Sequence, residues 1–161
     1  MKKVLAVVLS LVLVFSMTAC GSKDSLEGSW KITKFTMNGE DILTRSGINL
    51  AEKMSEKGVY MGLQAKSDKT VRMVAGEEEQ TLTWNDKTIS DGKDDLEYTI
   101  NGDILTISGT QGGVSMNMEL KKMTSDEASK FASQTADDVS NAIIAIGQEL
   151  AASMGGMESE E

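Results

Sequence analysis

The sequence predicts a mainly β domain: an antiparallel up-and-down barrel of about eight strands, with a short helix after its first strand and a C-terminal α-helix. Three observations predict this fold. Apolar and polar residues mostly alternate from Trp30 to Met123, which is typical of half-buried strands. Turn-forming residues interrupt this alternation at short intervals. The first strand changes phase midway, as strands do at a β-bulge, and bulges help a sheet to curl.

The predicted strands have one apolar and one polar face. In the last of them Met116, Met118 and Leu120 point to one side, and polar residues occupy the positions between them. One apolar face and one solvent-exposed polar face are typical of antiparallel sheets that wrap a core. The expected strands cover residues 29–37, 59–65, 69–75, 79–85, 87–90, 95–101, 103–109 and 113–122.

The phase change in the first strand predicts its bulge. Trp30 and Ile32 share one face, whereas Phe35 and Met37 share the other. One extra residue at positions 33–34 brings all four side chains to the inside.

Asn101-Gly102 marks the best-defined hairpin of the sheet. It separates two alternating stretches, residues 96–100 and 103–107. Asn-Gly readily adopts the positive φ angles of a type I′ turn, which matches the twist of paired strands. We therefore expect Asn101 and Gly102 to form the turn itself.

A short helical pattern follows the first strand, from Asn49 to Lys57. Asn49 and Glu52 have the spacing of a capping pair at its start. Gly58 is suited to the position just past its end.

A longer helical pattern ends the domain. It begins at Thr124, where Glu127 has capping-box spacing, and extends to about residue 154. An apolar stripe along it predicts that the helix packs on the outside of the sheet. The stripe consists of Val139, Ile143, Ile146 and Leu150, with Ala142 and Gly147 beside it.

The first twenty residues have the features of an exported lipoprotein. Two lysines precede an apolar run from Val4 to Val14, which is shorter than the about 20 residues that cross a bilayer as a helix. Thr18-Ala19 before Cys20 resembles a lipobox, which implies that a diacylglyceryl group is attached to the Cys20 thiol. Cys20 is the single cysteine of the chain, so an internal disulfide is excluded. Two or three acyl chains give a stable anchor.

These signals predict a lipid-anchored protein on the extracytoplasmic face of the cell membrane, with its barrel on a short tether. Six residues of tether reach roughly 20 Å when extended. The expected segments are the signal peptide 1–19, the lipidated tether 20–26, the barrel 27–123, the helix 124–154 and a disordered acidic tail 155–161.

Composition excludes several classes of function. The chain has no histidine, which removes the commonest general base and the commonest metal ligand. The net charge of −9 becomes −11 when residues 1–19, with Lys2 and Lys3, are removed. Contacts with nucleic-acid phosphates need clustered lysine and arginine side chains, so a nucleic-acid partner is not expected. The paired acids Asp94-Asp95 lie in a polar turn. We therefore expect no enzymatic activity, no cofactor and no metal.

The start of the domain resembles a known family. Leu26-Glu27-Gly28-Ser29-Trp30 resembles the Gly-x-Trp opening of lipocalins and of bacterial lipocalin-like lipoproteins. The resemblance extends over residues 26–123 and implies a lipocalin-like barrel. It also implies that Gly28 precedes the first strand and that Trp30 plugs the closed end. Lipocalins place an arginine over this tryptophan, and here Lys121 or Lys122 is the available cation.

Two functions follow from this fold, and the sequence leaves both open. The first is the binding of a small apolar ligand inside the barrel. The candidate lining residues are Met61, Leu63, Met73, Trp84, Tyr98, Met116 and Met118. The second is a non-enzymatic interaction or structural role in the cell envelope, with a filled barrel core and a partner protein there.

Overall fold

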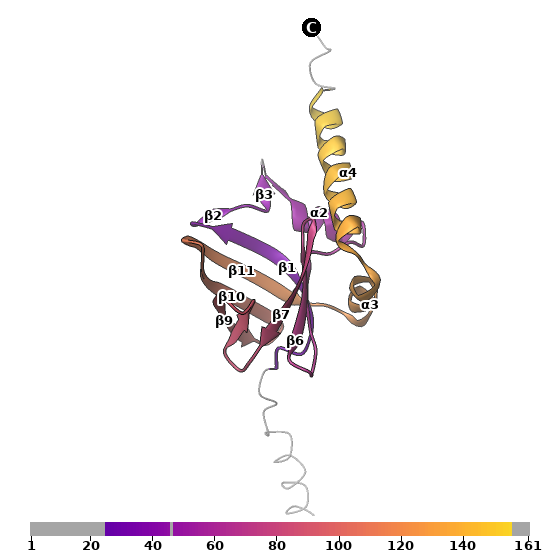
Figure 1. The fold of residues 1–161 in the computed structure, drawn as a ribbon. Helices are drawn as coiled ribbons and strands as arrows, with labels where there is room; N and C mark the ends of the chain where they lie inside the picture. The colour runs from indigo at the N-terminus through magenta and orange to yellow at the C-terminus, as the bar shows by residue number, and fades with distance from the viewer. Residues whose placement is uncertain (1–24, 46, 156–161) are drawn as a thin grey trace, which may run out of the picture.

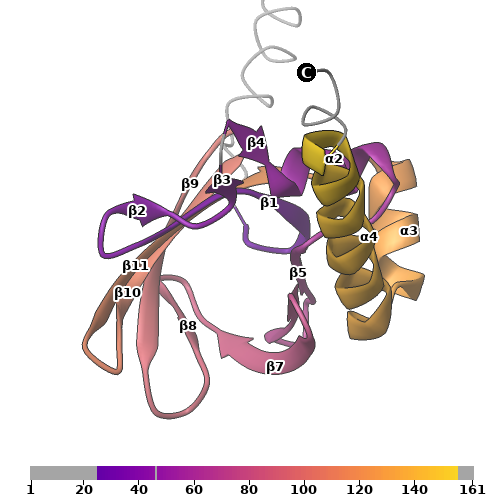
Figure 2. The same cartoon turned by 90° about the horizontal axis from the view of Figure 1, so that it is seen from above.

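A computed structural model of the chain describes residues 25–45 and 47–155. Within these residues, eight antiparallel strands form a closed ring, seen from above in Figure 2. The sheet order is β11-β10-β9-β8-β7-β6-β5-β1, and β11 pairs again with β1. The strands are β1 (Gly28–Met37), β5 (Gly62–Ala65), β6 (Thr70–Ala75), β7 (Glu78–Trp84), β8 (Thr88–Ser90), β9 (Asp95–Asn101), β10 (Ile104–Gln111) and β11 (Val114–Lys122). The predicted up-and-down barrel is confirmed.

The bulge in β1 lies where the change of phase predicts it. Ile32 pairs with Leu120 and Phe35 with Met118, so Thr33 is the extra residue of the longer strand. Leu120 and Met118 share one face of β11, and their partners therefore lie on one face of β1. The bulge thus brings Ile32 and Phe35 to the same side of the sheet.

The segment between β1 and β5 contains short elements (Figure 1). They are β2 (Glu40–Asp41), β3 (Thr44–Arg45), β4 (Ile48–Asn49) and the helix α2 (Leu50–Glu56). The predicted caps of this helix are confirmed, because the Asn49 side chain accepts a hydrogen bond of 3.2 Å from the Glu52 N–H. At the other end Gly58 and Val59 donate to the carbonyls of Ser55 and Met54. The strands β2, β3 and β4 have two residues each, too few to produce an alternating pattern.

The β9–β10 turn differs from the prediction by one residue. Asn101 pairs with Ile104, so the turn consists of Gly102 and Asp103, and Gly102 has a φ of 61°. Positive φ at the first turn position alone corresponds to type II′ and not to type I′. This register places Ile100 opposite Leu105 and avoids pairing Ile100 with Asp103. Apolar cross-strand pairing outweighs the local preference of Asn-Gly.

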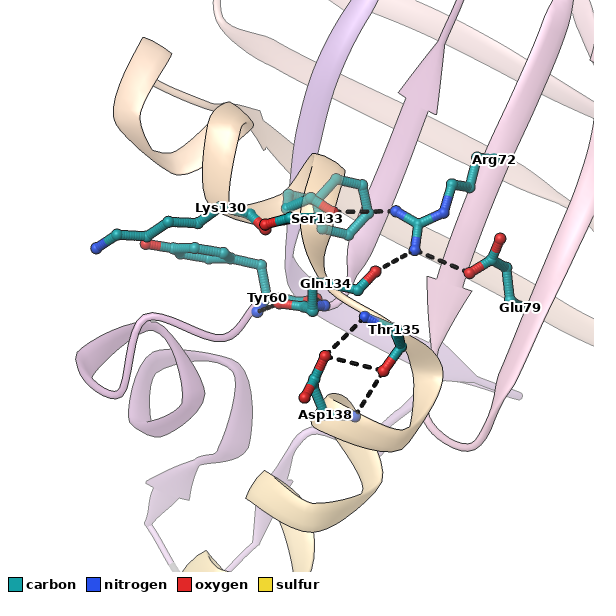
Figure 3. A network of polar contacts seen from close by, with 9 residues as sticks. Tyr60, Arg72, Glu79, Lys130, Ser133, Gln134, Thr135 and Asp138 are labelled. Atoms are coloured by element: carbon teal, nitrogen blue, oxygen red, sulfur yellow. Dashed lines mark hydrogen bonds and ion pairs between the residues drawn. The ribbon is translucent and has the colours of Figure 1, made fainter.

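The C-terminal region forms two helices where the sequence predicts a single one. These are α3 (Ser125–Ser133) and α4 (Ala136–Gly155). The capping box at Thr124 and Glu127 is confirmed. The chain leaves the helix at Gln134, whose backbone is extended. Thr135 then begins α4, since its N–H and hydroxyl both donate to Asp138 at 2.8 Å (Figure 3).

The two helices cover the outer face of the barrel beside β5 and β6 (Figure 2). Val139, Ala142 and Ile146 of the predicted stripe are buried, which confirms the predicted packing. Arg72 on β6 donates to the carbonyls of Phe131 and Gln134 and pairs with Glu79 at 2.8 Å (Figure 3). Within residues 25–45 and 47–155, no helix combines the length and apolar character that a membrane crossing requires.

Candidate functional site

One end of the barrel, where β1 begins and β11 finishes, is filled by side chains, and we refer to it as the closed end. Trp30 lies there with 1% of its surface exposed, and its indole N–H donates to the Leu26 carbonyl at 2.8 Å. Gly28 has a φ of 125°, which favours glycine between these two residues. The Lys122 ammonium lies 5.6 Å from the centre of the Trp30 ring. Lys122, and not Lys121, therefore supplies the cation expected over Trp30.

Trp84 and Tyr98 lie near the β7–β8 turn, and each is fixed to the backbone. The Trp84 indole N–H donates to the Lys66 carbonyl at 3.0 Å, and the Lys69 ammonium lies 3.5 Å from the ring centre. The Tyr98 hydroxyl donates to the Asn85 carbonyl at 2.7 Å. Burial raises the pKa of Tyr98. Both rings therefore complete the filled half of the barrel.

The opposite end, which we call the open end, contains a cavity of about 190 Å³. The turns between β6 and β7, β8 and β9, and β10 and β11 lie at this end. β7 and β8 pair only at Thr83–Ser90 and Trp84–Ile89, so residues 78–82 of β7 have a strand neighbour on one side only. The cavity lies where the barrel wall is incomplete. Its apolar lining consists of Phe35, Met73, Ala75, Leu82, Ile89, Leu96, Met116 and Met118.

Three of the seven predicted lining residues meet at this cavity: Met73, Met116 and Met118. Leu63 is fully buried in the filled half, and Met61, Trp84 and Tyr98 are also outside the lining. Alternation along a strand predicts which side chains point inward, and all of these residues satisfy it. It does not predict which of them lie near the open end.

Five further apolar lining residues are absent from the predicted set: Phe35, Ala75, Leu82, Ile89 and Leu96. The sequence feature that could have identified them is their position along the strands, close to the turns at the open end. Ile89 and Leu96 flank the β8–β9 turn, and Phe35 follows the bulge toward the end of β1. In an up-and-down barrel every second turn lies at the same end, so distance from these turns separates the two halves.

Polar side chains form the rim of the cavity, and they are Glu78, Gln80, Asp91, Asp94 and Gln111. One Asp91 carboxylate oxygen accepts from the backbone N–H groups of Lys93 and Asp94, both at 2.8 Å. These hydrogen bonds, the one from Asp94 first, lower the pKa of Asp91. Every charged side chain of the rim is acidic.

A second, more open hollow of about 490 Å³ lies between α2 and the outer face of β1 and β11. Most of its lining residues are polar or charged, among them Lys31, Glu52, Glu56 and Lys121. Apolar cavities with a few polar groups are the common form of small-molecule sites. The barrel cavity fits that description, and the outer hollow does not.

One predicted feature is not part of this geometry. Cys20, with the expected signal peptide, lies outside the described residues. In the part of the chain that the structure covers, no three acidic side chains cluster closely enough to hold a metal ion.

Of three comparisons with known proteins, one identifies the family. The comparisons with curated proteins and with solved structures found no match to the chain. The family model of the lipocalin-like domain matches residues 26–127, more than half of the chain. That span contains Gly28, Trp30 and all eight strands of the ring, and it ends in α3. The chain therefore belongs to the lipocalin-like domain family.

Proposed function

We propose that this protein is a lipid-anchored, extracytoplasmic and non-enzymatic binding protein that holds the apolar part of a small molecule in the open end of its barrel. The observation that carries the proposal is the apolar cavity of about 190 Å³, reached from the end opposite Trp30. The interior of an eight-stranded barrel is wide enough to hold one small ligand.

The size and lining of the cavity limit the ligand. Sites for drug-sized molecules have volumes of about 300–1,000 Å³, so this cavity takes a smaller molecule or only part of a larger one. Met73, Met116 and Met118 contribute flexible, polarizable side chains to the wall. Methionine adapts to ligands of irregular shape, which favours a range of apolar groups over one rigid shape.

Anchoring through Cys20 is compatible with access to this cavity. Cys20 precedes Gly28 by eight residues, and Gly28 begins β1 at the closed end. An extended tether of that length reaches about 28 Å. The anchor is thus joined to the closed end of the barrel and leaves the open end free for a ligand.

A binding role is favoured over catalysis by the residue types available. The chain has no histidine, and its single cysteine is assigned to the anchor. Of the rim acids, Glu78 and Asp91 are exposed and Asp94 is half-buried, whereas catalytic carboxyl groups are commonly enclosed in a cleft.

Binding can be tested on a soluble form that begins at residue 20, with Cys20→Ser, which retains every residue that the structure describes. The methionine methyl groups of this protein are labelled with ¹³C. Addition of octanol should then shift the NMR signals of Met73, Met116 and Met118. Met116→Trp places a bulky ring in the cavity and should abolish the shifts of the remaining Met73 and Met118 signals. The control is Asn117→Trp, the next residue of β11, which is exposed. Equal titration curves for both variants would contradict the proposed site.

Anchoring is tested on the full chain in a bacterial host. The wild-type protein should fractionate with membranes and incorporate labelled fatty acid, and Cys20→Ser should do neither. A wild-type protein without incorporated fatty acid would exclude the anchor.

A structural or protein-interaction role in the envelope is the second candidate, and the filled half of the barrel favours it. Trp30, Leu63, Leu105 and Leu120 are at most 1% exposed, so side chains occupy the closed end of the barrel and leave no space for a ligand there. This candidate is selected if no apolar compound shifts the methionine signals.

A further inference from the structure

We propose that the open end selects positively charged amphiphiles, binding the apolar tail of an amine in the cavity while its ammonium group stays among the acids of the rim. This inference rests on the proposed binding function and names its ligand class. The apolar cavity supplies the site, and the rim determines the charge of the ligand that it accepts.

The cavity holds a short tail. The cavity volume of about 190 Å³ has room for roughly six water-sized groups of about 30 Å³ each. The innermost lining residues, Leu82, Ile89 and Met118, are buried, whereas the rim residues near the turns are more exposed. A ligand with a longer chain therefore places its polar head at the rim, where the apolar lining ends.

The rim has one sign of charge. The charged side chains that line the cavity are Glu78, Asp91 and Asp94. They come from the start of β7 and from the β8–β9 loop, which are neighbours in the ring. Carboxylates at the opening of an apolar cavity attract a cation there and repel an anion.

Further acids lie on other segments at this end of the barrel. Glu40 and Asp41 form β2, Glu77 occupies the β6–β7 turn, and Asp95 begins β9. Lys93 is the base in the β8–β9 loop. Arg72 is occupied on the outer face, where it donates to Glu79 and to two helix carbonyls. No lysine or arginine of the described chain lines the cavity, so a carboxylate or phosphate head has no cationic partner there.

A metal ion does not explain the rim. Among residues 25–45 and 47–155, no three acids are grouped closely enough to coordinate one. One oxygen of Asp91 already accepts two backbone hydrogen bonds. A diffuse negative rim suits an organic ammonium group, which needs less exact coordination than a metal.

Three probes with the same tail test this inference: octylamine, octanol and octanoate. They are titrated into the soluble form with labelled methionines, and the Met116 and Met118 signals identify binding in the cavity. At about 0.01 M salt we expect octylamine to bind roughly tenfold more tightly than octanoate, with octanol between them. At about 1 M salt the difference should largely disappear, because the Debye length falls to about 3 Å.

The rim is tested with a triple variant, Glu78→Gln, Asp91→Asn and Asp94→Asn. Asparagine at position 91 retains an oxygen that can accept the loop hydrogen bonds. The variant should bind octanol as the wild type does and should lose most of the preference for octylamine. Asp103→Asn, in the β9–β10 turn at the closed end, is the matched control and should keep the preference.

The outcomes separate this inference from the function on which it rests. If octanol and octanoate bind in the cavity as tightly as octylamine, the charge selection is wrong and the binding function stands. A preference for octylamine that survives in the triple variant also overturns the rim assignment. If none of the three probes shifts the Met116 and Met118 signals, both the binding function and the charge selection fail.

Discussion

The side-chain amide of Gln134 makes hydrogen bonds with both backbone groups of Tyr60, a residue 74 positions earlier in the chain. Gln134 Oε1 accepts from the Tyr60 N–H at 2.8 Å, and its Nε2 donates to the Tyr60 carbonyl at 2.7 Å (Figure 3). All of these groups are buried. Gln134 thereby acts as a strand partner for the segment before β5, and it is the first residue after α3.

Gln134→Ala should therefore destabilise the protein by about 2–4 kcal/mol, because it leaves a buried N–H and a buried C=O of Tyr60 without partners. Urea denaturation of the soluble form measures the free energy of unfolding. Gln134→Glu keeps the acceptor for the Tyr60 N–H and loses the donor to the Tyr60 carbonyl, so this variant should also be less stable than the wild type. The control is Ser133→Ala, at an exposed neighbour, with a change within about 0.5 kcal/mol. Equal stability of Gln134→Ala and Ser133→Ala would contradict this role.

This pair also explains where sequence-based prediction of the fold reaches its limit. Alternation predicts a strand over residues 59–65, but β5 begins at Gly62. Val59 completes the end of α2, and Tyr60 bonds to Gln134 in place of a neighbouring strand. The bulge, the helix caps and the ring of eight strands depend on local patterns and could be predicted. The break at Gln134 depends on a residue distant in sequence and could not.

The candidate site was predicted less completely, for a similar reason. Alternation identifies inward positions, and Met73, Met116 and Met118 line the cavity as predicted. Whether an inward residue meets a cavity depends on where the wall opens. The opening arises because β7 and β8 pair over only two residue pairs. That length of pairing is a property of the assembled barrel.

The contact of Lys122 with Trp30 should stabilise the closed end. Lys122→Met is expected to cost about 0.5–1 kcal/mol through loss of the cation–π interaction, and Lys122→Arg should retain it. Lys121→Met, at the next residue of β11 on the opposite face, is the matched control. A double-mutant cycle with Trp30→Phe, measured by urea unfolding, isolates the coupling between the two side chains. A coupling energy near zero would assign Trp30 to the core without a contribution from Lys122.

Two glycines should respond to alanine with opposite signs. A Cβ on Gly62 would lie 2.2 Å from the Trp30 carbonyl oxygen, which is backbone and cannot move aside. Gly62→Ala should cost about 3 kcal/mol by overpacking. Gly147 lies in α4 with no atom within 4 Å of the added Cβ, so Gly147→Ala should stabilise by about 1 kcal/mol through helix propensity. Thermal unfolding of both variants tests the pair, and a stabilised Gly62→Ala protein would contradict the close approach of β1 and β5.

The protein should lose stability in acid, and Glu127 should contribute to that loss. Burial alone would raise the pKa of Glu127, but the hydrogen bonds from Lys31 and the Thr124 N–H outweigh it and lower the pKa below its ordinary 4.5. The Lys31 ammonium lies 2.5 Å from the carboxylate. A folded-state pKa below the unfolded one means that the unfolded chain binds more protons in this range. The stabilisation is therefore fully present above about pH 4.5 and is lost as pH falls through the lowered folded-state pKa.

Glu127→Gln tests this contribution, because glutamine keeps the capping-box hydrogen bond and removes the charge. At pH 7 the variant should be less stable than the wild type by up to about 1 kcal/mol, the usual range for a partly exposed ion pair. The stabilities of the two proteins should converge as pH falls below 4.5 and Glu127 becomes protonated in the folded state as well. Lys31→Met should also make the free energy of unfolding less dependent on pH, as Glu127→Gln does. If the wild type and Glu127→Gln lose stability in parallel from pH 7 to pH 3, the acid sensitivity comes from other carboxylates whose pKa values are lowered, such as Glu79 beside Arg72.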